Sequence, residues 1–139
     1  MQVHLYDTAA QVGQAAAVLI GAQLIEKPSS VLGLATGSTP IPTYRELAKL
    51  HQLGVVDFSS AVSFNLDEYC RLPVEHPCSY HYFMQEELFR HVNFSPRNTH
   101  VPDGNAPDLA AECARYDAAI QKAGGIDLQL LGIGRNGHI

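Results

Sequence analysis

The chain has 139 residues, of which 46% are hydrophobic and 17% are charged, and its formal net charge at pH 7 is −5. This length suits one domain with its own core, and the acidic balance disfavours a nucleic-acid partner, whose phosphates attract basic surfaces. The sequence lacks a secretory signal and an apolar run long enough to span a bilayer, so we expect a cytoplasmic protein that does not bind membranes.

The chain begins with segments typical of a strand, a helix and a second strand. "VHLY" (3–6) has the composition of a short strand, and a helical pattern starts at Asp7 or Thr8 and ends before Pro28. The apolar positions of this pattern are Val12, Ala16, Leu19, Ile20 and Leu24. The apolar run "VLGLA" (31–35) predicts a strand that is buried on both faces.

A second helix is expected after the segment "TGST", with Thr39 as its cap and Pro40 in its first turn. One face of this helix carries Ile41, Tyr44, Leu47, Ala48 and His51. "AVSFNL" (61–66) predicts a third strand, which a long polar loop follows.

A third helix is expected to begin after Ser79, which can cap it, and to reach about Val92. Its apolar side carries Phe83, Met84 and Leu88. "THVP" (99–102) then predicts a short strand.

The last predicted elements are a helix that runs from Asp108 to about Lys122 and a strand over "IDLQLLGI" (126–133), with Gly124 between them. Strands that alternate with amphipathic helices predict a doubly wound, Rossmann-like α/β fold with a mainly parallel sheet. We expect residues 1–139 to form a single α/β domain.

Three loops directly follow the best predicted strands, at residues 36–40, 67–69 and 134–138. In sheets of this kind ligands bind at the carboxyl ends of the strands. If the strands are parallel, all three loops emerge at one edge of the sheet, and the chemistry is to be sought among them.

The loop "ATGSTP" (35–40) has the composition of an anion site. Gly37 lets the backbone approach a ligand, and Thr36, Ser38 and Thr39 offer hydroxyl groups. The amides at the start of the following helix would favour a phosphate. The motif lacks the GK[ST] ending of a nucleotide-binding P-loop. A capped turn without any ligand is an equally good interpretation of this loop alone.

"DEY" places Asp67 and Glu68 just after an apolar strand. Adjacent residues at a strand end point in different directions, so one acid can face the cleft while the other makes structural contacts. Lost solvation would raise the pKa of the first acid toward that of a useful general base. On this motif alone, a solvated acid or a helix cap is the better interpretation.

"GIGRNGHI" (132–139) combines a strand end, a glycine turn and His138. Histidine is the side chain best suited to move a proton near neutral pH. The alternative is a tight turn with an incidental histidine, since the chain has 7 of them. The letters GxGxxG occur here as well, but the helix and acidic partner of a dinucleotide site do not follow.

The sequence does not favour a metal site. His76, Cys78 and His81 lie close together in "HPCSYH", but a second pair of ligands is missing. The 3 cysteines, Cys70, Cys78 and Cys113, form no CxxC pair, which is typical of reduced thiols.

Four motifs together resemble the glucosamine-6-phosphate deaminase family: "GLATGSTP", "FNLDEY", "HPCSYHYFM" and "GIGRNGHI", in that order. The likeness covers nearly the whole chain and includes "DGNAPD" (103–108). The wider superfamily, with 6-phosphogluconolactonases and ribose-5-phosphate isomerases, shares the glycine loop and the sheet. "NLDEY" followed by "HPCSYHYFM" points to the deaminase branch.

The resemblance implies conversion of glucosamine 6-phosphate and water to fructose 6-phosphate and ammonia, by ring opening, proton transfer from C2 to C1 and imine hydrolysis. Asp67 matches the family's base, and His138 matches the residue that accepts the anomeric hydroxyl proton. Residues 36–39 would hold part of the phosphoryl group. The implied reaction needs neither a metal nor an organic cofactor.

The chain departs from the family's pattern in two ways. Some members carry aspartate where this chain has Asn136, which can orient an imidazole but lacks the charge, so a supporting role is implied. In the family "GHI" continues into "GFNEP", whose glutamate assists ring opening, followed by a lid and basic phosphate ligands. The chain is therefore expected to be the N-terminal portion of a deaminase, truncated at its C-terminal side, and inactive or nearly so alone.

Two alternatives remain open from the sequence. One is a hydrolase of the 6-phosphogluconolactonase type, and the other is a non-catalytic domain that senses a sugar phosphate. In each case the partner is a small sugar phosphate, and the sequence does not distinguish a monomer from a homo-oligomer.

Overall fold

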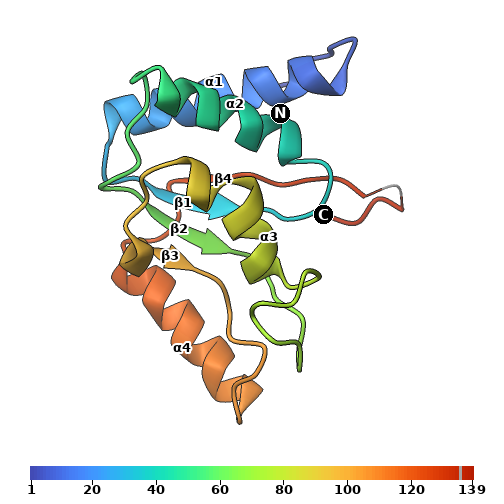
Figure 1. Cartoon of the computed structure of the whole chain (residues 1–139), viewed down its shortest axis with the longest axis vertical. Coiled ribbons are helices and arrows are strands. Elements are labelled where there is room, and N and C mark those ends of the chain that lie inside the picture. Colours follow the sequence, from blue (N-terminus) through green and yellow to red (C-terminus); the bar gives the residue numbers. More distant parts are fainter. Residues whose placement is uncertain (135) are drawn as a thin grey trace.

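Helices and strands alternate along the computed structural model, which describes residues 1–134 and 136–139 (Figure 1). In chain order the elements are α1 (Ala9–Glu26), β1 (Val31–Leu34), α2 (Ile41–Gln52), β2 (Val62–Asn65), α3 (Tyr80–Glu87), β3 (Thr99–His100), α4 (Leu109–Lys122) and β4 (Leu128–Gln129). Single 3-10 turns at Phe89–His91 and Pro96–Asn98 lie between α3 and β3.

The strands form one sheet in the order β3-β2-β1-β4, and every neighbouring pair is parallel. On one face, Leu32 and Leu34 of β1 join a core with residues of α1, α2 and α3. On the other face, Val31 and Phe64 pack against Tyr116 of α4. Helices thus cover both faces, and the predicted doubly wound α/β fold with a mainly parallel sheet is confirmed (Figure 1).

Three of the predicted helix caps are present. The Thr8 hydroxyl accepts the Gln11 amide at 3.2 Å in a capping box, Ser79 caps α3, and Asp108 caps α4. The predicted cap at Thr39 is wrong, because Pro40 occupies the cap position of α2 and no side chain bonds there. The amide groups at the start of α2 are therefore not used by a side-chain cap.

Two predicted strands differ from the structure. Residues 1–6 lie outside any helix or strand, since no neighbouring strand pairs with them. The segment 126–133 contains only the short strand β4, although the amides of Asp127 and Leu130 also donate to β1 carbonyls at 2.8 and 2.9 Å. An apolar run marks a buried extended segment here, but not the length of regular pairing.

The predicted apolar face of α1 is only partly correct. Val12 and Leu19 are 49% and 68% exposed. The buried positions are Gly13, Ala17, Ile20, Gly21 and Leu24. A Cβ on Gly13 would lie 2.5 Å from the Cβ of Pro42, so α1 crosses the first turn of α2 on its small residues. Because α1 is apolar on several sides, its sequence pattern did not reveal which side makes this close contact.

Side chains tie the carboxyl ends of the strands together. The buried Tyr44 donates its hydroxyl to the carbonyl of Ala35, just after β1. Asn65 at the end of β2 donates to the Leu34 carbonyl at 3.0 Å. The Tyr116 hydroxyl donates to the carbonyl of Asn65 at 2.9 Å. These bonds fix the edge of the sheet from which the loops emerge.

We expect Tyr44→Phe to lower the free energy of unfolding by about 1–3 kcal/mol, because the buried Ala35 carbonyl loses its donor. Burial raises the pKa of Tyr44, so the hydroxyl donates throughout the neutral range. Urea unfolding followed by circular dichroism measures the loss. Tyr82→Phe, at a 37% exposed side chain, is the control and should change stability by less than about 0.5 kcal/mol. Equal stability of Tyr44→Phe and the unsubstituted chain would contradict the assignment.

Candidate active site

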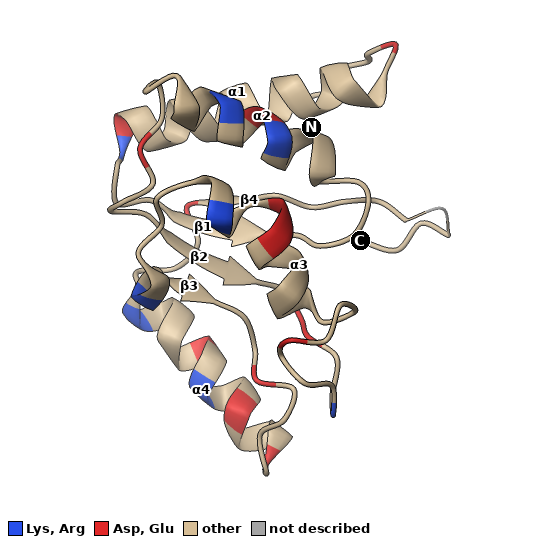
Figure 2. Ribbon diagram, viewed as in Figure 1, with Lys and Arg blue, Asp and Glu red and all other residues tan. Residues whose placement is uncertain are grey.

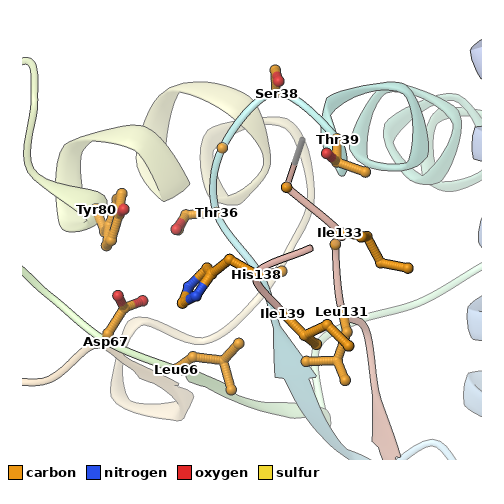
Figure 3. A pocket seen from close by; sticks show the side chains of 14 residues that line it. Thr36, Ser38, Thr39, Leu66, Asp67, Tyr80, Leu131, Ile133, His138 and Ile139 are labelled. Atoms are coloured by element: carbon orange, nitrogen blue, oxygen red, sulfur yellow. The ribbon is translucent and has the colours of Figure 1, made fainter. Parts of the chain in front are cut away.

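The structure brings the three predicted loops together around one cleft of about 560 Å³. Figure 3 shows side chains from the β1, β2 and β4 loops directed toward the same space. The lining residues lie at 35–39, 66–67, 80, 131–134 and 138–139. The parallel sheet explains this convergence, because the carboxyl ends of its strands lie at one edge.

The loop after β1 forms one wall of the cleft. Thr36, Gly37, Ser38 and Thr39 all line it, and Gly37 has φ of 97°, a conformation that favours glycine. A Cβ on Gly132 would lie 3.3 Å from the Cβ of Thr39, so the β1 and β4 loops are in contact. The backbone of this loop and the hydroxyl groups of Thr36, Ser38 and Thr39 therefore stand beside the cleft, a combination that suits an anion.

None of the described residues that form this wall is a lysine or an arginine. Within residues 1–134 and 136–139, neither Lys nor Arg lines the cleft, and Figure 2 shows these residues mainly on the helices.

Asp67 stands at the end of β2 and lines the cleft. Loss of hydration raises its pKa, the neighbouring Glu68 carboxylate raises it further, and His138 acts in the opposite direction. In Figure 3 the Asp67 carboxyl lies opposite the imidazole of His138. A carboxyl with a raised pKa that faces an imidazole is suited to proton transfer.

Glu68 is absent from the lining of the cleft and bonds the first amides of α3. Its Oε1 accepts the amides of Tyr69 and Tyr80 at 2.7 and 2.9 Å, and its Oε2 accepts the amide of His81 at 2.9 Å. The two adjacent acids point in different directions, as expected for neighbours at a strand end. One lines the cleft and the other makes structural contacts.

His138 is held by a tight turn. The Gly134 amide donates to the His138 carbonyl at 2.7 Å, and the Gly137 amide, at φ of 80°, donates to the Gly134 carbonyl at 2.9 Å. Figure 3 shows the imidazole between Asp67 and Thr36. Residue 135 of the "GRNGH" motif lies outside the described residues.

Asn136 contacts the backbone of this turn. Its amide oxygen accepts the backbone N–H of His138 at 3.2 Å. Among the described residues that line the cleft, Asn136 does not appear. It therefore supports the histidine through the main chain, whereas the sequence suggested a bond to the imidazole.

Tyr80, the first residue of α3, also lines the cleft and was not identified from the sequence. Its hydroxyl donates to that of Tyr69 at 3.4 Å, and this bond, with burial, raises the pKa of Tyr80 to about 12. A hydrogen bond with Thr36 lowers that pKa, and the charge of Asp67 raises it. Tyr80 therefore offers a protonated hydroxyl beside Asp67. The predicted cap at Ser79 marked the start of this helix but not the direction of its first side chain.

In the "HPCSYH" segment, a histidine side chain bonds the main chain of the same segment. The Nδ1 of His76 accepts the Cys78 amide at 3.1 Å. No group of three His, Cys, Asp or Glu residues in the described part of the chain is arranged to hold a metal ion. Cys70, Cys78 and Cys113 are exposed free thiols. Of the helices described, none is both long and apolar enough to cross a membrane.

Known proteins are similar to this chain in sequence and in fold. Residues 5–139 match the family described as glucosamine-6-phosphate isomerases/6-phosphogluconolactonase. The chain is 55% identical to the glucosamine-6-phosphate deaminase of Halothermothrix orenii over 139 residues, which are 100% of this chain and 58% of that protein. The solved structure of a monomeric glucosamine-6-phosphate deaminase matches with TM-score 0.96 and 46% identity, over 100% of this chain and 58% of the other.

A 6-phosphogluconolactonase from Thermotoga maritima has the same fold, with TM-score 0.78 and 25% identity over 96% of this chain and 60% of the other. The resemblance drawn from the four sequence motifs is confirmed by these matches. The chain spans little more than half the length of the relatives, 58% of the Halothermothrix orenii protein.

We expect Asp67→Asn to raise the free energy of unfolding at pH 7. The pKa of Asp67 is higher in the folded chain than in the unfolded one, so its ionisation costs stability as the pH rises through that range. The gain should vanish below about pH 3, where the carboxyl is protonated in both states. Urea unfolding at several pH values measures it.

Glu75→Gln, at an exposed acid of the same loop, is the matched control and should leave stability unchanged at each pH. A less stable Asp67→Asn variant at pH 7 would show that the folded chain favours the ionised carboxyl.

Proposed function

This chain belongs to the family of glucosamine-6-phosphate isomerases and 6-phosphogluconolactonases, and from that premise we propose that it carries the proton-transfer residues of a glucosamine-6-phosphate deaminase. The reaction takes glucosamine 6-phosphate and water to fructose 6-phosphate and ammonia. The observation that carries the proposal is a single cleft in which Asp67 and His138 face each other beside the 36–39 loop.

Ring opening comes first and needs a group that accepts the proton of the anomeric hydroxyl. The imidazole of His138 projects into the cleft (Figure 3), and imidazole is the group that most often serves as a general acid or base in enzymes. Asn136 keeps the backbone of this histidine in place through the bond to its N–H. We assign ring opening to His138, with Asn136 as a positioning residue.

Proton transfer from C2 to C1 follows and needs a base that can also return the proton. Asp67 lies across the cleft from His138, and its raised pKa suits a group that both accepts and donates. Asp67 is the base that moves the proton from C2 to C1. Water then attacks the resulting imine at C2, and the amino group leaves as ammonia.

The phosphoryl group occupies the wall formed by residues 36–39. Among the described residues, the backbone amides of this loop and the hydroxyls of Ser38 and Thr39 are donors for it. The Tyr80 hydroxyl lines the cleft beside Asp67 and bonds the sugar there, either by accepting a hydrogen bond or by turning its proton from Tyr69 to the sugar.

The deaminase is favoured over a lactonase by two observations. The chain is 46% identical to the deaminase of known structure and 25% identical to the Thermotoga maritima lactonase. Lactone hydrolysis also needs no proton abstraction at C2, whereas the paired Asp67 and His138 suit that step. A sensor would need neither group.

Ammonia release from glucosamine 6-phosphate tests the proposal. The chain of 139 residues should release little or none, while its fusion to the part of the Halothermothrix orenii relative that this chain does not span should be active. A fusion that hydrolyses 6-phosphogluconolactone and releases no ammonia would overturn the proposal. Substantial ammonia release by the 139 residues alone would show that they suffice.

In the active fusion, Asp67→Asn should lower kcat/KM by about 10²–10⁴, the range for loss of a general acid–base group. The amide keeps the shape of the side chain but cannot accept the C2 proton. The exposed Glu75→Gln provides the control for charge and is expected to keep full activity. Undiminished turnover by Asp67→Asn would remove Asp67 from the reaction.

Tyr80→Phe should lower kcat/KM by about three- to tenfold, the usual effect of losing one neutral hydrogen bond. The ring and its packing remain, so folding should be unaffected. Tyr82→Phe, two residues along the same helix and absent from the lining of the cleft, is the control. Equal kinetics for the two variants would mean that the Tyr80 hydroxyl does not contact the substrate.

A further inference from the structure

The loop that starts with Asp67 has no helix or strand before α3 begins at Tyr80. A loop of this kind positions a side chain well only if other parts of the protein hold it. Within it Arg71 has φ of 63°, an uncommon backbone conformation for a residue other than glycine, which shows that its path is imposed by contacts. Two sets of contacts hold the first residues of the loop.

The first set joins the loop to α3 through Glu68. One carboxylate accepts the amides of Tyr80 and His81, the first two residues of the helix, each at 2.9 Å. These amides lack partners within the helix, so the carboxylate satisfies their hydrogen bonds. Its negative charge also interacts favourably with the positive end of the helix dipole. The residue next to Asp67 is thereby bonded to the turn that carries Tyr80.

The second set joins the loop to the segment before α4. The Gly104 carbonyl accepts the Arg71 amide at 3.0 Å, and the Asn105 side chain donates to the Leu72 carbonyl at 2.7 Å. A Cβ on Gly104 would lie 2.0 Å from the carbonyl oxygen of Tyr69, so a larger residue would push this backbone away.

The two sets of contacts meet at Tyr69, which lies between them in the chain. Its ring packs on Tyr80 with a centroid distance of 4.9 Å. The groups that act on Asp67 electrostatically are Glu68, beside it, and His138, across the cleft, and Asp67 in turn acts on Tyr80. A shift of residues 67–69 would therefore change the spacing of the acid, the imidazole and the tyrosine.

We propose that Glu68 and Gly104 are positioning residues, which hold the backbone of residues 67–69 between α3 and the segment before α4. Asp67 and Tyr80 thereby meet one substrate in fixed relative positions. The inference rests on the proposed function only for the identity of that substrate. Loss of either contact disturbs the geometry of proton transfer and leaves the phosphoryl wall at residues 36–39 intact.

Amide hydrogen exchange in the 139-residue chain tests the role of Gly104 without any activity. Gly104→Ala should speed exchange of the Tyr80 and His81 amides at least about tenfold, because the displaced backbone loosens their bonds to Glu68. Ala106→Gly, in the same segment, leaves the space beside Tyr69 untouched and should not change them. Unchanged protection in Gly104→Ala would overturn the role of Gly104.

Glu68→Gln tests the other contact with a side chain of the same shape. It removes the negative charge beside Asp67, so the pKa of Asp67, followed by carboxyl 13C NMR, should fall. Glu75→Gln is the control and should leave it unchanged. Exchange of the Tyr80 and His81 amides, which bond the Glu68 carboxylate, should also become faster in Glu68→Gln, and unchanged exchange would overturn the role of Glu68.

In the active fusion, Glu68→Gln and Gly104→Ala should each lower kcat at least about tenfold and change KM less than about threefold. A loss confined to KM, or unchanged kcat, would contradict a positioning role. If the unsubstituted fusion releases no ammonia, the proposed function fails, while hydrogen exchange and NMR still decide the inference.

Discussion

The parallel alignment of β1, β2 and β4 is the constraint on which the candidate site depends, because it ends three strands at one edge. Side-chain bonds to the main chain fix that edge: Tyr44 bonds the carbonyl after β1, and Asn65 bonds β2 to β1 at 3.0 Å. The edge determines where the loops begin, and contacts with α3 and with the segment before α4 hold the longer loop that follows β2. The hydroxyl-bearing loop 36–39, an acid and an imidazole from distant parts of the sequence thus meet at one cleft (Figure 3).

The fold places the Asp67 carboxyl where its ionised form is less stable than in water. A carboxyl at the mouth of an apolar sheet loses hydration, and a second acid beside it adds repulsion. Glu68 stays in that place because backbone amides of α3 bond its oxygens. The strand end therefore separates the roles of two adjacent acids, one held by structural bonds and one left open to a ligand.

Much of the fold followed from the sequence, since the buried runs at 31–35 and 61–66 and the caps at Thr8, Ser79 and Asp108 are local signals. The predictions failed where the outcome depends on neighbours. Residues 1–6 have strand composition but no strand beside them, and the packed side of α1 depends on the close crossing with α2.

The candidate site shows the same division. The glycine turns and polar residues after buried strands identified Asp67, His138 and the 36–39 loop. The sequence did not identify Tyr80, because the packing of a helix sets the direction of its first side chain. The contact of Asn136 with the backbone N–H of His138 was also hidden, since spacing alone does not distinguish main-chain from side-chain partners.

The most direct test of the convergence is a 1H–15N NMR titration of the chain with 2-amino-2-deoxyglucitol 6-phosphate, an open-chain amino sugar phosphate. The account predicts that amide signals of residues 36–39, Asp67 and His138 shift together, with one common dissociation constant. Shifts confined to a single loop, or grouped on another face of the protein, would contradict it.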